Sequence, residues 1–218
     1  MSDAVLIISS RNYSSWSLRG WLLTRLAGLD VEVRIVDPDD AVARDELMMR
    51  TSSIRLPRLL HKDVELWDTL AIAEYLNETF PKAGMLPKDP VARANCRSIS
   101  GEMHSGFTAL RSALPRNLRA RRTNFPLWSA VRGDIERVTE IWRTCFDSWG
   151  GPWLYGAKPS IADAMYAPVC TRFVTYDVKI DPASAAYCDR TLAMPDLISW
   201  TNDAAAEVAE VAELEVEF

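Results

Sequence analysis

The segment PKAGMLPKDP, residues 81–90, constrains the fold of this chain more than any other part of it. It contains three prolines and one glycine in ten residues. Proline lacks a backbone N–H and fixes φ, so neither a long helix nor a central strand can continue through such a segment. The sequence pattern also changes here, from alternating strand and helix signals to helix signals alone. We therefore predict two domains, over residues 1–80 and 91–218, joined by a linker over 81–90.

Short apolar runs near the N-terminus predict strands. Residues 5–8 form a continuous apolar run, as in a buried strand, and residues 31–36 alternate in polarity, as in a half-buried one. Residues 18–29, between them, repeat apolar side chains at i, i+3 and i+4, which indicates a helix. A strand, a helix and a strand in this order form a right-handed unit with parallel strands.

A hairpin and two further helices complete this first domain. Residues 56–61 and 64–67 are strand-like and are separated by two residues, the length of a hairpin turn. A less regular helix is predicted over 39–50 and a regular one over 69–80. The order β-α-β-α-β-β-α, with a parallel pair followed by an antiparallel hairpin, is typical of a thioredoxin-like α/β domain.

The second domain shows helix signals only, so we expect it to be all-α. Helices are predicted over residues 91–114, 127–149, 160–176 and 195–212. The tail beyond Asn202 is rich in Ala, Glu and Val, and we expect it to be a solvated helix end without a chemical role. The expected fold class is α/β followed by all-α.

Composition excludes several classes of function. The formal charge of −5 has the wrong sign for attraction to phosphate backbones, so nucleic acid is not an expected partner. No apolar run approaches the roughly 18 residues that span a bilayer, so we expect no membrane partner and a cytoplasmic location. The four cysteines contain no CxxC pair, which indicates reduced thiols. The chain has only two histidines, so no metal site is expected.

A serine-rich loop follows the first predicted strand. Ser14, Ser15 and Ser17 lie where the first predicted helix begins. Free backbone N–H groups and the helix dipole favour negative charge there, and a hydroxyl can donate to an anion such as a thiolate. The serines could equally act only as helix caps, and their spacing leaves both interpretations open.

Pro57 and the pair Asp68-Thr69 are two further candidates. A cis bond before Pro57 would expose the Leu56 backbone as a strand edge for an extended peptide, whereas a trans bond would make Pro57 an ordinary edge-strand residue. Asp68 and Thr69 stand at the start of a predicted helix. They could cap it, or they could bind the ammonium and carboxylate groups of a zwitterionic ligand.

In combination, these features resemble the glutathione-binding half of the cytosolic glutathione transferases. Residues 14–19, SSWSLR, are most similar to the serine-type motif of the zeta class and its bacterial relatives. In the second domain, residues 160–163, SIAD, are similar to the family's capping box in a central helix. The resemblance covers nearly the whole chain. It implies a thioredoxin-like domain before an all-helical one, glutathione as co-substrate, and a homodimer.

The resemblance also implies how the thiol is activated. Ser14 would donate its hydroxyl to the glutathione sulfur, with Ser15 as the second candidate, and Arg19 would be structural. A free thiol with a pKa of about 8.5 is only about 3% ionised at pH 7, and lowering that pKa by about two units raises the thiolate fraction to roughly three quarters. One charge-assisted hydrogen bond and a helix N-terminus can supply such a shift.

Roles for the rest of glutathione follow from the same resemblance. The Leu56 backbone, ahead of a cis Pro57, would pair with the cysteinyl unit. Asp68 and Thr69 would bind the γ-glutamyl end, where the family more often has Glu or Gln followed by Ser. Arg55 could contact the glycyl carboxylate.

The electrophile is expected to bind between the domains, as ligands often do. The first long helix after the linker would supply Met103, His104, Phe107 and Arg111. The arginines between 111 and 122 form a basic run, which we expect to be a solvated helix end, although it could attract an anionic substrate.

Three functions are compatible with these residues. The leading hypothesis is a glutathione transferase that adds the thiol to small electrophiles. The second is a glutathione-dependent cis–trans isomerase of a maleyl-type keto acid, in which the thiolate adds to a double bond, allows rotation and leaves. The third is a binding protein that holds glutathione or another ligand without turnover.

Overall fold

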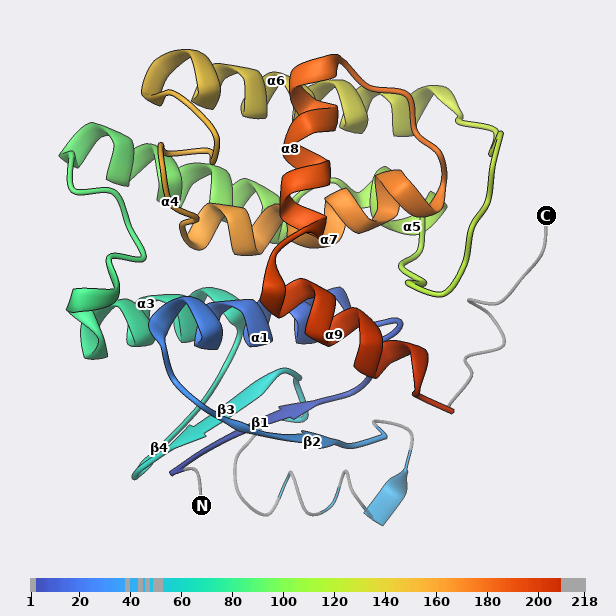
Figure 1. Cartoon of the computed structure of the whole chain (residues 1–218). Coiled ribbons are helices and arrows are strands. Elements are labelled where there is room, and N and C mark those ends of the chain that lie inside the picture. Colours follow the sequence, from blue (N-terminus) through green and yellow to red (C-terminus); the bar gives the residue numbers. More distant parts are fainter. Residues whose placement is uncertain (1–2, 38–39, 43–44, 46–47, 49–52, 209–218) are drawn as a thin grey trace.

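Four strands form one mixed sheet in the computed structural model, which describes residues 3–37, 40–42, 45, 48 and 53–208 (Figure 1). They are β1 (Ala4–Ile8), β2 (Glu32–Ile35), β3 (Arg58–His61) and β4 (Val64–Trp67), in the order β2-β1-β3-β4. β1 is parallel to β2 and antiparallel to β3, which is antiparallel to β4. The predicted parallel pair and hairpin are both confirmed. The helix predicted over 39–50 falls mostly on residues outside the described ranges.

The strand register gathers apolar side chains at the centre of the sheet. Leu6 of β1 is paired with Val33 of β2 on one side and with Leu59 of β3 on the other. Leu6 and Leu59 are fully buried. At the turn of the hairpin, Lys62 has a φ of 54°, as the turns that match the twist of two antiparallel strands require.

Two helices lie between this sheet and the helices of the C-terminal domain (Figure 1). They are α1 (Ser15–Ala27) and α3 (Thr69–Thr79), which pack on each other. α1 also packs on α7 (Ile161–Thr175) of the C-terminal domain. The start of α1 therefore lies at the junction of the two domains.

The described part of the C-terminal domain is all-helical. After the short 3₁₀ helix η1 (Pro81–Ala83) come α4 (Pro90–Ser105), α5 (Thr108–Ala113), α6 (Ser129–Trp149), α7, α8 (Pro182–Leu192) and α9 (Pro195–Ala205). The predicted fold class, α/β followed by all-α, is confirmed.

Two predictions about these helices are wrong, and one helix was not predicted. The single helix predicted over 91–114 is broken at Gly106 and Phe107, and Phe107 has a left-handed φ of 59°. A Cβ on Gly106 would lie 2.8 Å from the Glu102 carbonyl oxygen, so glycine permits the chain to turn closely there. Helix α8 has no counterpart among the predicted helices, and α9 ends at Ala205 rather than at residue 212.

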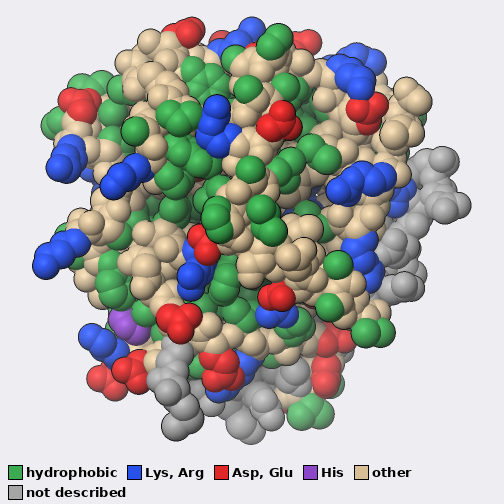
Figure 2. Space-filling model, in the orientation of Figure 1, with side chains coloured by type: hydrophobic (Ala, Val, Ile, Leu, Met, Phe, Trp, Pro, Cys, Tyr) green, Lys and Arg blue, Asp and Glu red, His purple; other side chains and the backbone are tan. Residues whose placement is uncertain are grey.

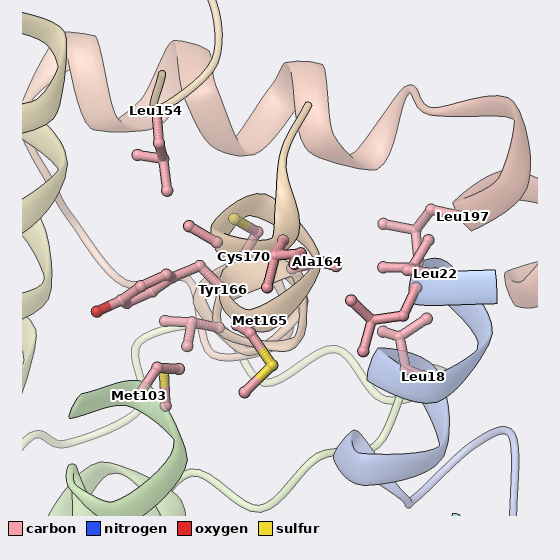
Figure 3. Close-up of a cluster of buried hydrophobic side chains, with 14 of the residues drawn as sticks. Leu18, Leu22, Met103, Leu154, Ala164, Met165, Tyr166, Cys170 and Leu197 are labelled. Atoms are coloured by element: carbon pink, nitrogen blue, oxygen red, sulfur yellow. The ribbon is translucent and has the colours of Figure 1, made fainter. Parts of the chain in front are cut away.

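Helix α7 is the centre of a core that both domains share. Every residue of α7 except Val174 is buried. Figure 3 shows Leu18 and Leu22 of α1 on one side of α7 and Met103 of α4 on the other. The predicted capping box starts this helix, because the Ser160 N–H donates to the Asp163 carboxylate at 2.7 Å. The core thus continues across the domain junction.

Gly20 of α1 packs directly against Pro57, and its replacement by alanine should destabilise the protein by about 1–3 kcal/mol. A Cβ at Gly20 would lie 2.9 Å from Cγ and 3.0 Å from Cβ of Pro57. The matched control is Gly101→Ala, in α4, where a Cβ has no neighbour within 4 Å. That change should stabilise the helix by about 0.5–1 kcal/mol. Urea unfolding of both variants measures the difference, and equal effects would contradict the packing argument.

Candidate active site

A cavity of about 240 Å³ is lined by residues of both domains. Its lining comes from the first turn of α1, the segment before β3, the start of α3 and the last turn of α4. The residues are Trp16, Arg55, Leu56, Pro57, Asp68, Thr69 and His104. All except Trp16 are site residues that the sequence predicts, so the fold brings together side chains from three separate parts of the chain.

Ser14 is the N-cap of α1, and within the described part of the chain its hydroxyl oxygen accepts two hydrogen bonds while its proton donates none. Its Oγ accepts from the Ser17 N–H at 3.1 Å and from the Ser17 hydroxyl at 2.8 Å. The Ser17 Oγ in turn accepts from the Ser9 N–H at 3.4 Å. With two bonds accepted, Ser14 keeps its own proton to donate, and donors linked in this way polarise one another. Ser14 is half-buried and is not among the residues that line the cavity, whose nearest member in the sequence is Trp16.

Ser15, the second candidate, is placed differently. It is the first residue of α1, its side chain is buried, and its Oγ has no hydrogen-bond partner among the described residues. It does not line the cavity. Neither hydroxyl belongs to a residue that lines the cavity; of the two residues, Ser14 is the less buried.

The segment before β3 presents its backbone to the cavity. The Leu56–Pro57 peptide bond is cis. Leu56 precedes the β3 ladder, and its backbone makes no hydrogen bond within the part of the chain that the structure describes. Arg55 beside it is exposed and lines the same cavity. An extended ligand could pair with the free Leu56 backbone there.

Asp68 and Thr69 form the start of α3 and line the same cavity. Asp68 is the N-cap, and its Oδ1 accepts from the Leu70 N–H at 2.8 Å. Its φ of 79° and ψ of 129° lie in a region that non-glycine residues rarely adopt, at a cost of about 1–3 kcal/mol. Such strain is typical of functional sites. Thr69 is almost fully buried behind Asp68.

His104 lines the cavity from α4 and lies beside Asp68 and Thr69. Its Nε2 lies 3.1 Å from Oδ2 of Asp68, and its Nδ1 lies 3.4 Å from the Thr69 hydroxyl. Its ring centroid is 4.9 Å from that of Trp16. Trp16 lines the cavity but was not predicted as a site residue, because an apolar residue in the first turn of a helix usually belongs to the core. Its position directly after Ser14 and Ser15 was the signal that could have indicated a place in the site.

The other three residues predicted for the electrophile site lie elsewhere. Met103 and Phe107 are buried in the hydrophobic core and do not line the cavity. The Arg111 guanidinium donates to the carbonyls of Met103 and Gly106 at the end of α4. It also lies 4.9 Å from the Trp16 ring centroid. Arg111 therefore contacts the Trp16 ring and the carbonyls at the end of α4 without lining the cavity.

Arg116 of the basic run is buried, which corrects the interpretation of the whole run as a solvated helix end, although Arg119 and Arg121 are exposed. Arg116 is only 2% exposed. Its Nη1 donates to the carbonyls of Arg11, Asn12 and Ser14, at 2.9, 3.1 and 3.0 Å. Arg116 thus joins the C-terminal domain to the loop that carries Ser14.

Four arginine side chains surround the buried side of this loop and of α1. Arg19 is buried with its guanidinium 4.6 Å from the Trp16 ring, and Arg172 is buried on α7. Burial and the neighbouring arginines lower the pKa of Arg19. Burial lowers the pKa of Arg111 and lowers that of Arg116 to about 9. Among the described residues, none of the four lies within 4.0 Å of a carboxylate. Their positive charge adds to the dipole of α1 in favouring an anion beside Ser14.

The cysteines are not nucleophiles in this fold. All four are free and buried. Burial raises the pKa of Cys96 to about 12 and that of Cys145 to about 11, so these thiols stay protonated at neutral pH. Within the described ranges, no cluster of three or more His, Cys, Asp or Glu side chains could hold a metal ion.

Two surface properties bear on partners. On the face shown in Figure 2, Lys and Arg side chains are interspersed with Asp and Glu rather than gathered into a basic surface. In the described part of the chain, no helix has both the length and the apolar composition needed to cross a membrane.

A four-stranded mixed sheet with its covering helices, followed by a helical domain, is the architecture of the glutathione transferases. The family models agree with this architecture. The model of the glutathione S-transferase N-terminal domain matches residues 13–79, and that of the C-terminal domain matches residues 101–190. The chain therefore belongs to the glutathione S-transferase family, whose co-substrate is glutathione.

Three known proteins illustrate what the chain is similar to. A probable maleylacetoacetate isomerase of Caenorhabditis elegans is 27% identical over 183 residues, which cover 84% of this chain and 85% of that protein. A glutathione transferase homologue from Burkholderia, crystallised with bound glutathione, matches 93% of this chain and 98% of its own, with a TM-score of 0.69 and 24% identity. A maleylacetoacetate isomerase from Anaeromyxobacter dehalogenans, with bound dicarboxyethyl glutathione and citrate, matches 92% and 95%, with a TM-score of 0.64 and 23% identity.

Proposed function

We propose that this protein is a glutathione transferase in which Ser14 stabilises the glutathione thiolate for addition to a small electrophile. The observation that carries the proposal is the state of the Ser14 hydroxyl. Its acceptor positions are filled by the N–H and hydroxyl groups of Ser17, so its proton is free for a ligand. A hydrogen bond from this proton to a thiolate is charge-assisted and favours the ionised form of the thiol.

The surroundings of Ser14 act in the same direction. Ser14 caps the positive end of the α1 dipole, and the buried guanidinium of Arg116 donates to its carbonyl. Positive charge close to a thiol lowers its pKa. Together these groups favour a thiolate at neutral pH without a cysteine or a metal ion taking part.

The other cavity residues are assigned to the remaining parts of glutathione. We assign the free Leu56 backbone to the cysteinyl unit and Arg55 to the glycyl carboxylate. The Asp68 carboxylate, at the start of α3, is assigned to the γ-glutamyl ammonium. These three contacts would hold an extended tripeptide along the cavity, with its sulfur toward the start of α1.

A cis–trans isomerase of a maleyl-type keto acid is the second candidate. It is favoured by the relative from Caenorhabditis elegans, named a probable maleylacetoacetate isomerase, whose similarity extends over 84% of this chain. The two reactions differ in thiol balance: a transferase consumes one thiol for each product, whereas an isomerase returns it. Counting free thiols during turnover of a cis-configured keto diacid therefore separates them.

The test of the main proposal is a pH titration of the thiolate absorbance of glutathione bound to the purified protein. We expect the pKa of the bound thiol to lie about two units below the free value of about 8.5. S-methylglutathione is the control ligand, because it occupies the same site and has no ionisable thiol. An unshifted pKa with tight binding would instead identify a glutathione carrier, and no saturable binding would exclude both.

Two further parts of the proposal come from the family alone. We propose a homodimer and a cytoplasmic location, as the resemblance to cytosolic glutathione transferases implies.

A further inference from the structure

Glu207 lies two residues beyond the end of α9, and its carboxylate contacts a loop that stands 196 residues earlier in the chain. The carboxylate accepts from the Ser10 hydroxyl and from the Arg11 N–H. We propose that Glu207 is a positioning residue, which holds the loop over residues 10–13 and thereby fixes the place of the Ser14 hydroxyl. The inference rests on the function proposed above. It assigns a role to the acidic tail, for which the sequence predicts none.

The first route from Glu207 toward Ser14 runs through the Ser10 hydroxyl. Ser10 donates its proton to Oε1 of Glu207 at 2.5 Å, and its oxygen accepts from the Tyr13 N–H at 3.0 Å. A hydroxyl that donates to a carboxylate becomes a stronger acceptor, so the two bonds reinforce each other. Oε2 of the same carboxylate accepts from the Arg11 N–H at 2.7 Å. One carboxylate therefore holds the start of the loop directly and the residue before Ser14 through one hydroxyl.

The second route uses the backbone of Glu207. The Arg119 guanidinium donates through Nη1 to the Glu207 carbonyl at 2.7 Å and through Nη2 to the Tyr13 hydroxyl at 2.8 Å. The same guanidinium lies 5.7 Å from the centre of the Tyr13 ring. Both routes therefore end at Tyr13, one at its main-chain N–H and the other at its side chain. Because Ser14 directly follows Tyr13, the two routes together restrict where the Ser14 backbone can lie.

Other residues of the C-terminal domain hold the same loop through its carbonyls. The Trp200 indole N–H donates to the Arg11 carbonyl at 2.9 Å, and the Arg116 guanidinium donates to three carbonyls of the loop and of Ser14. Glu207 supplies the complementary acceptors, for a hydroxyl and an N–H of the loop. Loss of the Glu207 carboxylate should therefore loosen the position of the loop without releasing it from the C-terminal domain.

The charge of Glu207 and its hydrogen bonds have opposite effects on a thiol bound beside Ser14. Burial and Arg172 lower the pKa of Arg116 to about 9, whereas the Glu207 carboxylate raises it, so Glu207 is a counter-charge to this arginine. A negative charge in this region disfavours a thiolate, and its removal alone would lower the pKa of the thiol. Loss of a well-placed Ser14 donor would raise that pKa. The sign of the change therefore separates positioning from charge.

The experiment titrates the thiolate of bound glutathione in two single variants and in their double variant, each in the full-length protein. Glu207→Ala removes both acceptor oxygens, and Ser10→Ala removes the hydroxyl that links Glu207 to Tyr13. We expect each single variant to raise the pKa of the bound thiol by about 0.5–1 unit. At a pH below this pKa, kcat should fall by the matching factor of about three to ten, with the KM for glutathione within about twofold. The double variant should shift the pKa no further than Glu207→Ala alone, because both residues act on one route.

Two further variants complete the design. Glu207→Gln removes the charge but keeps one acceptor oxygen, so it should raise the pKa of the bound thiol less than Glu207→Ala does. Glu74→Ala is the matched control, because Glu74 is also a partly exposed carboxylate, is paired with Arg97 at 2.8 Å, and lies outside the cavity lining. We expect it to change neither the pKa nor kcat. Urea unfolding of every variant shows that the compared proteins are folded.

A lowered or unchanged pKa of the bound thiol in Glu207→Ala would overturn the inference, since Glu207 would then act by its charge alone or not at all. Effects of Glu207→Ala and Ser10→Ala that add in full would also overturn it, because the two residues would then act separately. Failure of the proposed function is visible in the unsubstituted protein. That protein would then bind no glutathione, or would bind it without lowering the pKa of its thiol.

Discussion

Ser14→Ala is expected to lower the turnover of glutathione with a general electrophile by about 10- to 100-fold, the worth of one charge-assisted hydrogen bond to the sulfur. Affinity for glutathione should change much less, because the proposed contacts of Leu56, Asp68 and Thr69 are untouched. The pKa of the bound thiol should rise toward its free value in the same variant. Steady-state kinetics and the thiolate titration measure these two effects.

Ser14→Ala also removes the N-cap of α1. Two control variants separate the resulting loss of stability from the loss of the hydrogen bond to the thiolate. Loss of the Ser14 N-cap alone costs about 0.5–2 kcal/mol of stability, whereas glycine at the same position costs only a few tenths. Ser14→Gly should therefore keep most of the stability and still lose the turnover. Ser15→Ala removes a buried hydroxyl without a described partner, so its stability and its turnover should both stay near those of the unsubstituted protein. A larger loss of turnover in Ser15→Ala than in Ser14→Ala would assign the thiolate to Ser15.

Arg116→Ala is expected to lower the free energy of unfolding by about 2–4 kcal/mol. The guanidinium group is the shared donor to three backbone carbonyls, those of Arg11, Asn12 and Ser14. Its removal leaves the Asn12 carbonyl without this donor and leaves a cavity at a buried site, whereas the Arg11 carbonyl keeps the Trp200 indole N–H and the Ser14 carbonyl keeps the Leu18 N–H. Part of the loss is offset, because the burial that lowers the pKa of Arg116 also makes its charge costly in the folded state.

Denaturant unfolding measures this loss, and Arg121→Ala is the matched control. Arg121 belongs to the same basic run but is exposed, and among the described residues its guanidinium donates to carbonyls of its own segment, those of Leu118 and Ala120. We expect its replacement to change stability by less than about 0.5 kcal/mol. If both variants lose the same amount, Arg116 does not join the two domains in the way described.

The elements that follow from local pattern could be predicted from the sequence. The apolar run at 5–8, the two-residue turn at Lys62 and the linker prolines each depend on neighbouring residues only, and the predicted parallel pair, hairpin and fold class are confirmed. Membership of the glutathione S-transferase family is confirmed as well. The roles of individual site residues and the domain boundaries at 80 and 91 stay predictions.

Contacts between distant parts of the chain could not be predicted. A buried arginine and a solvated one have the same local sequence pattern, and the acceptors of Arg116 lie about a hundred residues earlier. The acidic tail shows the same effect. Its described part, which ends at residue 208, is not merely solvated, because the Glu207 carboxylate accepts from the Ser10 hydroxyl at 2.5 Å and from the Arg11 N–H at 2.7 Å. Trp16 was missed for a related reason, since its exposure depends on where α4 and α5 end.

The linker at 81–90 separates the two domains along the chain. The core around α7 is nevertheless built from residues of both domains, so the two domains depend on each other's sequence. Leu18 and Leu22 of α1 face α7 across the domain junction, so each half supplies part of the other's interior (Figure 3). A recombination event that exchanged the first eighty residues with those of a distant relative would have to match this apolar face as well as the site. Substitutions in the apolar face of one domain are therefore expected to require matching substitutions in the other domain.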